Sequence, residues 1–272
     1  MESISIFIVL GLALAGLAVV SALSWCVRRQ HQKQKRIQGV MWVQALRSML
    51  MHIQRHRGLS ATVLGGEYAL MAELTSAQHA VSRDLAHIAL VGEWIKENPN
   101  WEAITAHWAR LAGQFHRLDI RKNLDQHNRL IKSILVFIDD VSREHYLLTL
   151  QNDKTSWRYL LSVAEDLGQI RAVGLAYISS LEVGEASHRL RNTLQALMAE
   201  FSLEVEQVDF QQYLSVSNQQ ATQAFVEKYP KVLLLHADQC PLAQYYQAAT
   251  DVMDGLYMQF DDEIMLIQRT LN

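Results

Sequence analysis

A permanent positive charge interrupts an apolar seam with helical spacing. Aliphatic residues recur at steps of three and four from Val43 to Ile53, and the next step of four falls on Arg57. The seam then continues at Ser60 and Leu64. Because a guanidinium does not lose its proton in proteins, a buried arginine needs an anion or a set of hydrogen-bond acceptors. The position of Arg57 therefore predicts an anion-binding or ion-paired site inside the helix packing.

Arg171 occupies a second seam of the same kind. Apolar and small residues follow helical steps through residues 157–181, and Arg171 takes one position of that series. A small residue, Ser60 or Gly174, follows each arginine by three positions and leaves space beside the guanidinium. Two facing guanidiniums repel each other unless an anion lies between them, and a planar oxyanion matches the fork of an arginine. The two seams predict a small inorganic oxyanion between Arg57 and Arg171.

An internal ion pair is the alternative explanation for a seam arginine. Arg57 could pair with the carboxylate of Asp139, Asp140 or Glu165, or its charged end could reach solvent. The chain would then be a helical scaffold or adaptor protein whose arginines are structural and bind no ligand. The sequence leaves both interpretations open.

Other polar residues do not assemble into a catalytic or metal site. His52 and His56 are four residues apart on a helix, but neither an H-E-x-x-H pattern nor a nearby cysteine completes a metal site. No nucleophile, base and orienting group are arranged together. We therefore expect no enzyme activity, no metal, and no cofactor apart from the oxyanion as ligand.

The charge balance argues against nucleic acid as a partner. The chain has 25 lysines and arginines against 28 acidic residues, and residues 1–36 hold five of the bases and one of the acids. The remainder has an excess of roughly seven acidic residues. An acidic body without a basic stripe is not typical of a nucleic-acid-binding protein.

The composition favours helices throughout the chain. Three prolines and twelve glycines are few breakers for 272 residues, and no alternating β-branched run bounded by turns is present. We expect an all-α chain with a helical-bundle domain and short connections. The expected helices run from the N-terminal segment to Leu64 and over residues 68–96, 101–118, 121–150, 157–181, 188–209, 219–229 and 241–271.

The N-terminal segment predicts a membrane anchor. Residues 4–27 contain no charged side chain and are long enough to cross a hydrocarbon core of roughly 30 Å. A basic run without acids follows at residues 28–36, which by the positive-inside rule puts the N-terminus outside and the rest of the chain in the cytoplasm. We expect a single-pass transmembrane helix in residues 1–27, a basic juxtamembrane segment in 28–40, and one domain in 41–272.

A cleaved signal fits this segment less well than an anchor. A signal peptide has a basic start and a shorter apolar core. A lipoprotein site would end at Cys26, but Trp25 stands where a small residue is required. Cys26 and Cys240 are the only cysteines and do not predict a disulfide framework.

Three stretches carry a resemblance to a known family. The stretch "IQRHRGLSA" (residues 53–61) resembles the Q-x-E-R-G-x-S signature at the start of NIT domains, the nitrate- and nitrite-sensing domains of bacterial signalling proteins. The stretch "LGQIRAVGLAYI" (residues 167–178) is similar to the second signature, G-Q-E-R-A. The stretch "HNRLIKSILVFIDDVS" (residues 127–142) resembles the helix between them.

The resemblance implies a fold and a site. It implies two helical bundles packed together, and nitrate or nitrite bound by one arginine from each signature. Carried onto this sequence, these arginines are Arg57 and Arg171. Gln54, Ser60 and Gln169 also match the motifs and are candidate supporting residues.

The sequence departs from both signatures at the residue before the arginine. His56 and Ile170 stand where the family usually has an acid. The loss of these acids predicts a more positive site, which favours anions in general and nitrate among them.

The resemblance also implies a role in signalling. We expect a sensor in the bacterial inner membrane that binds nitrate or nitrite and signals through helix rearrangement. Because no kinase, nucleotide-binding or DNA-binding motif is present, we expect its output through an unknown separate protein or through a homodimer.

Overall fold

The computed structural model describes the backbone of residues 2–150, 157–181 and 185–271, and the side chains of residues 15–150, 157–181 and 187–271. Helices account for all regular structure in these ranges, which confirms the all-α prediction. The α-helices are α1 (Glu2–Leu64), α2 (Met71–Val91), α3 (Pro99–Gln114), α4 (Ile120–Glu144), α5 (Trp157–Ser179), α6 (Glu185–Val205), α7 (Val208–Tyr213), α8 (Val216–His236) and α9 (Leu242–Leu271). Short 3-10 helices cover Tyr68–Leu70, Phe115–Arg117, Leu147–Leu150 and Ala237–Gln239.

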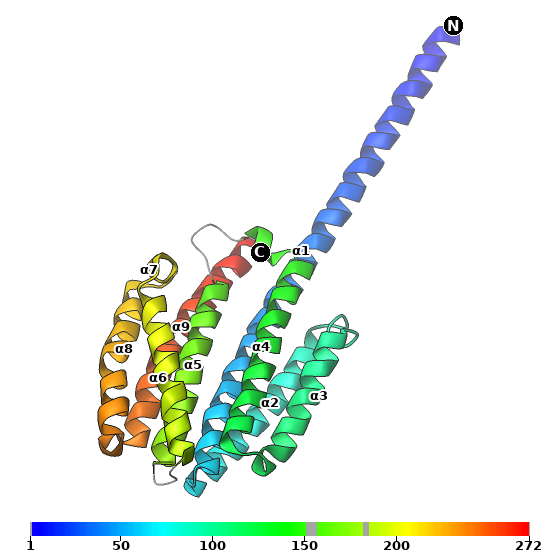
Figure 1. Cartoon of the computed structure of the whole chain (residues 1–272). Coiled ribbons are helices and arrows are strands. Elements are labelled where there is room, and N and C mark those ends of the chain that lie inside the picture. Colours follow the sequence, from blue (N-terminus) through cyan, green and yellow to red (C-terminus); the bar gives the residue numbers. More distant parts are fainter. Residues whose placement is uncertain (1, 151–156, 182–184, 272) are drawn as a thin grey trace.

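Two groups of helices lie side by side (Figure 1). The first contains the C-terminal half of α1 with α2, α3 and α4, and the second contains α5, α6, α8 and α9. The C-terminal half of α1 contacts α2 and α4 in its own group and α5 and α9 in the other. Arg57 lies on this shared part of α1, so its side chain can reach both groups.

The apolar seam of α1 forms part of the core as predicted. Val43, Leu46, Leu50 and Ile53 are fully buried, and they belong to one hydrophobic cluster that extends through both groups of helices. The cluster includes the largest buried aromatic side chains of the two groups, Trp42 among them. Burial of these side chains is the main source of the free energy that holds the helices together.

Local signals in the sequence set several helix ends. Asn98 accepts a hydrogen bond from the backbone N–H of Asn100 and caps α3, and Pro99 takes the first helical position. Asp119 caps α4 and Ser215 caps α8 in the same way. Beyond the end of α1, Gly66 adopts a φ of 115°, which is unfavourable for other residues.

Two expectations about the later helices are wrong. The helix expected over 219–229 is longer, because α8 continues through Pro230 to His236. Proline removes one backbone hydrogen bond from a helix, and here the packing of α8 against α6 and α9 outweighs that loss. The helix expected over 188–209 ends earlier, at Val205, and the short helix α7 begins at Val208.

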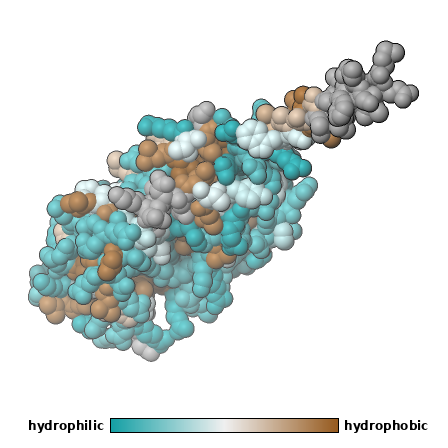
Figure 2. Space-filling view, turned by 90° about the horizontal axis from the view of Figure 1, so that it is seen from above, coloured by the Kyte–Doolittle hydropathy of each residue, from teal (hydrophilic) through white to brown (hydrophobic). Residues whose placement is uncertain are grey.

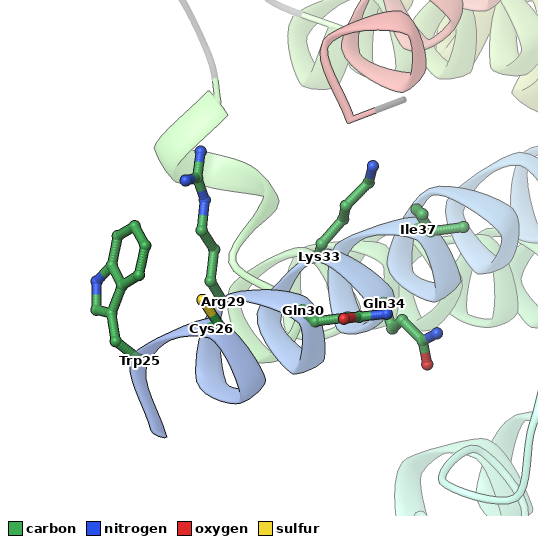
Figure 3. Close-up of a pocket in the computed structure, with 7 residues that line it drawn as sticks. All are labelled: Trp25, Cys26, Arg29, Gln30, Lys33, Gln34 and Ile37. Carbon is green, nitrogen blue, oxygen red and sulfur yellow. The ribbon is translucent and has the colours of Figure 1, made fainter. Parts of the chain in front are cut away.

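The first part of α1 forms an exposed stem that leaves the two groups of helices (Figure 1). The side chains of residues 15–34 are exposed, and Figure 2 shows apolar side chains of this stem next to the grey atoms. Figure 3 shows a shallow hollow along the stem, which residues of α1 alone line. In this hollow the Arg29 guanidinium lies 5.3 Å from the ring centre of Trp25. Lys35 and Glu144 form an ion pair where the stem reaches α4.

The predicted membrane anchor is not supported. Within the part of the chain that the structure describes, none of the helices combines the length and the apolar character needed to cross a membrane. The described side chains before Arg28 begin at Ala15, and this segment is shorter than the roughly 20 apolar residues that such a helix requires. The first residues of the predicted anchor, 4–14, lie outside the described side chains. The expected transmembrane helix in 1–27 and the inner-membrane localisation are therefore corrected.

Candidate functional site

The guanidinium of Arg57 is fully buried and joins three helices. It is 0% exposed, and its two terminal nitrogens contact both carboxylate oxygens of Glu165 on α5 at 2.6 and 3.2 Å. One of these nitrogens also donates to the side-chain oxygen of Asn128 on α4 at 2.7 Å. The ion pair is thus bidentate, which is the favourable geometry for arginine and carboxylate. Of the three carboxylates considered as partners from the sequence, Glu165 is the one that pairs.

The other two candidate carboxylates pair elsewhere. Asp139 forms a bidentate pair with Arg158 at 2.5 and 2.6 Å, and Asp140 bonds Arg143 at 2.8 Å. Both pairs are partly exposed and lie at the surface of the helices.

Gln54 and Tyr257 extend the network from Glu165 to α9. The side-chain amide of Gln54 donates to Glu165 at 2.8 Å, and the Tyr257 hydroxyl donates to the Gln54 oxygen. Burial raises the pKa of Tyr257, with a further rise from the charge of Glu165, so its hydroxyl remains a donor. Gln54, which the sequence motif marked as supporting, is therefore part of the same cluster as Arg57.

A glycine makes room for the Arg57 side chain. A methyl group built on Gly168 would lie 2.7 Å from a terminal nitrogen of Arg57 and 3.4 Å from the amide nitrogen of Gln54. The contact with Arg57 is too close, so a larger residue at this position would force the guanidinium to shift.

Arg171 is buried like Arg57 but has no carboxylate bonded to it among the described residues. It is 4% exposed, donates to the Thr250 hydroxyl at 2.9 Å, and lies 5.4 Å from the ring centre of Tyr246. Both partners belong to α9. Burial lowers the pKa of Arg171, and the nearby positive charge of Arg57 lowers it further. Burial raises the pKa of Asp254 and the charge of Arg171 lowers it, but no ion pair joins these two residues in the described part of the chain.

The two arginines share one electrostatic environment. The charges of both act on Tyr257, and that of Arg57 acts on Arg171. The structure therefore brings Arg57 and Arg171 into one cluster, with one bonded carboxylate for two guanidiniums. In each of them the Nε–H group is buried and has no hydrogen-bond acceptor in the described part of the chain. Buried N–H groups without acceptors are uncommon in proteins.

The remaining candidate residues lie at the edge of the cluster. Ser60 is buried, but its hydroxyl donates to the backbone oxygen of Arg57 at 3.1 Å and accepts from Asn123 at 2.9 Å. Gln169 is half-buried and takes no part in the hydrogen bonds described around either guanidinium. Ile170 is a core residue whose backbone oxygen accepts from the Tyr245 hydroxyl at 2.7 Å.

His56 faces α4. Its ring nitrogen Nδ1 lies 2.8 Å from the ring nitrogen Nε2 of His127. Trp108 and Phe115 pack edge-on against its ring. Burial lowers the pKa of His56 to about 3, so the ring is neutral at physiological pH. The residue that replaces the usual acid therefore adds no charge to the arginine cluster.

A pair of carboxyl groups lies next to the cluster on α5 and α6. Burial, with the charges of Glu204 and Glu165, raises the pKa of Asp166 to about 7. Burial also raises the pKa of Glu204. The folded chain thus favours a protonated Asp166 at a pH where an exposed aspartate is ionised.

Comparisons with known proteins agree with this architecture. A model of the family described as "NIT: Nitrate and nitrite sensing" matches residues 48–264. A solved structure of the NasR transcription antiterminator is similar to this chain with a TM-score of 0.65 and 14% identity, covering 92% of this chain and 74% of that one. At this identity the similarity shows a common fold. No curated protein matches the chain.

The substitution Glu165→Gln tests the buried ion pair. It leaves the Arg57 charge buried without a carboxylate, and we expect the free energy of unfolding to fall by about 3–5 kcal/mol. Asp139→Asn is the matched control, because it removes the carboxylate of a partly exposed bidentate pair, and we expect a loss of at most about 1 kcal/mol. Urea unfolding of both variants measures the difference. Equal losses would contradict a special role for Glu165.

The pH dependence of stability tests the environment of Asp166. Because its folded pKa lies above the ordinary value, the folded state holds this proton more tightly, and stability decreases as the pH rises through the window from about 4 to about 7. We expect Asp166→Asn to remove this contribution, so that between about pH 4 and 7 the variant loses less stability than the wild type. Urea unfolding at several pH values measures this, with Asp125→Asn as control. Parallel curves for Asp166→Asn and the wild type would contradict the assignment.

Proposed function

The chain belongs to the nitrate- and nitrite-sensing (NIT) family, whose model matches residues 48–264, and on this premise we propose that it binds nitrate or nitrite between Arg57 and Arg171. The residues that match the family lie within 41–272, which we take as the sensing domain. We propose that it senses the anion and does not convert it chemically, since the proposed site offers cations and hydrogen-bond donors to a ligand.

The observation that carries this proposal is the pair of unsatisfied Nε–H groups. Arg57 and Arg171 each have one buried N–H without an acceptor in the described residues. An oxygen of a bound anion is the natural acceptor for a guanidinium N–H, and such charge-assisted bonds are stronger than neutral ones. An anion that accepted from both arginines would satisfy both groups at once.

The charge of the cluster favours a monovalent anion. Two guanidiniums with one bonded carboxylate leave one positive charge, and nitrate or nitrite would neutralise it. A divalent anion such as sulfate would leave a buried negative charge, which is unfavourable without further partners. Nitrate and nitrite are also planar, as the guanidinium is.

Glu165 competes with the proposed ligand for Arg57. In the structure its carboxylate takes both terminal nitrogens of Arg57, with oxygens where a planar oxyanion could also bond. A bound anion would have to share Arg57 with Glu165 or displace it. Either change would alter the contact between α1 and α5, because Arg57 and Glu165 lie on these two helices.

Rearrangement of these contacts is the proposed signal. Arg57 bonds α4 and α5, while Arg171 bonds α9, so an anion between them would act on all four helices of the cluster. A ligand shifts a conformational equilibrium only by its difference in affinity for the two states. We propose that the state with the anion is read by a separate output protein or by a second copy of the chain.

A scaffold without a ligand is the second candidate function. The bidentate pair of Arg57 with Glu165 favours it, because that arginine already has an internal counter-charge. Arg171 has no such partner among the described residues, and this difference favours the sensor.

Thermal unfolding of the full chain with added anions tests the proposal. A ligand at about 100 times its dissociation constant stabilises the folded state by about 2.7 kcal/mol. At about 2–4 °C per kcal/mol for a domain of this size, the midpoint would rise by several degrees. We expect this rise with nitrate or nitrite, and none with chloride or sulfate at equal ionic strength.

Three variants test which residues the anion-dependent rise of the unfolding midpoint requires. Arg171→Ala removes the arginine that has no bonded carboxylate, and we expect it to abolish the shift while the protein stays folded. Arg158→Ala is the control, because Arg158 pairs with Asp139 outside the cluster and its loss should leave the shift unchanged. Glu165→Gln removes the competing carboxylate and should increase the affinity for nitrate. No anion-specific shift at millimolar concentration would contradict the sensor and support the scaffold.

A further inference from the structure

The outer faces of α3 and α4 enclose a hollow that the proposed anion site does not use. Its apolar side is formed by Ile104 of α3 and by Val136 and Phe137 of α4. Val136 is 51% exposed, so part of this apolar surface is open to solvent. Arg110 of α3 and Arg129 and Lys132 of α4 also line the hollow. These six residues define what we call the α3–α4 groove.

The three cations of the groove have no bonded carboxylate in the described part of the chain. The other lysines and arginines of α4 each have one. Near the start of α4, Arg121 lies 3.9 Å from Asp125 and Lys122 lies 3.2 Å from Asp119. At its end, Arg143 pairs with Asp140. Of the lysines and arginines on α4, the two without a bonded carboxylate in the described part of the chain, Arg129 and Lys132, thus both line the groove.

The acidic residue at one end of the groove is already engaged. Asp140 lines the hollow, but it bonds Arg143 at 2.8 Å and accepts from Asn100 at 3.3 Å. His107, which also lines the groove, lies close enough to Arg110 and Arg129 that their positive charges lower its pKa, in addition to the larger effect of burial. The groove is therefore a positive region on a chain with a net charge of −3.

We propose that the α3–α4 groove docks an acidic amphipathic segment of the protein that receives the signal. The acidic side chains of such a segment would pair with Arg110, Arg129 and Lys132, and its apolar face would cover the exposed Val136. Charge complementarity of this kind guides the encounter and selects the partner. An exposed apolar surface beside unpaired cations fits a peptide better than a nucleic acid, which is bound chiefly through its phosphates.

Helix α4 connects this groove to the arginine cluster. Asn128, which accepts from Arg57, is adjacent in sequence to Arg129, and His127 bonds His56 on the same inner side. Any shift of α4 caused by a new partner for Arg57 would therefore move Arg129 and Lys132 relative to Arg110 on α3. This coupling rests on the proposed function, whereas docking in the groove can be measured without any anion.

Fluorescence anisotropy with the full chain tests the docking. The probe is a fluorescein-labelled synthetic peptide of glutamates and leucines spaced as in an amphipathic helix. We expect the double variant Arg129→Glu and Lys132→Glu to weaken binding at least tenfold. The matched control is Arg121→Glu with Lys122→Glu, which makes the same charge change on the same helix outside the groove and should have little effect.

Further measurements test whether the peptide binds through its charges and its apolar face. The peptide with glutamine in place of glutamate should bind weakly, and Val136→Asp should weaken binding of the glutamate peptide. The proposal is overturned by no binding, by equal loss in both double variants, or by tighter binding of a single-stranded RNA that depends on Arg129 and Lys132. Groove-dependent peptide binding that nitrate leaves unchanged would uphold docking and count against the coupling and the proposed signal.

Discussion

The charge of Arg57 in the middle of an apolar seam constrains the surrounding helices. A buried guanidinium without acceptors would destabilise the fold, so α5 supplies a carboxylate from Glu165 and α4 supplies the oxygen of Asn128. Gly168 keeps the space open for this side chain, Gln54 also donates to the carboxylate, and Tyr257 donates to Gln54. One buried cation thus sets the polar contacts that join α1 to α4 and α5.

Arg171 does not repeat this solution, although its seam has the same pattern. It is also buried, yet its bonded partner is a hydroxyl and its guanidinium lies over the ring of Tyr246. A protein under selection for stability alone has little reason to bury a second cation without a carboxylate. The difference between the two arginines is the physical reason to regard the cluster as a site for an anion, with Glu165 as an internal competitor.

The spacing of apolar residues predicted much of this arrangement. It predicted the buried face of α1 from Val43 to Ile53 and the burial of both arginines, because helical periodicity is a local property. It did not select Glu165 from three carboxylates, or find Tyr257, which meets Gln54 across 203 positions of sequence, since such contacts depend on how helices pack. The predicted anchor is not supported, because the described apolar side chains of α1 before Arg28 form a shorter stretch than a membrane-spanning helix requires. The orientation of the His56 side chain likewise depends on the packing of α4 and could not be predicted from the adjacent residues in the sequence.

The Nε–H groups of Arg57 and Arg171 allow the most direct test of the central claim, that one anion binds both arginines. In protein labelled with ¹⁵N at arginine, their two Nε–H resonances can be assigned with the variants Arg57→Lys and Arg171→Lys and followed during a nitrate titration. If one anion accepts from both groups, both resonances will move with the same midpoint, and the equivalent signal of Arg158 will not. If neither resonance moves at saturating nitrate, or if only the exposed arginines respond, the two buried cations do not form an anion site.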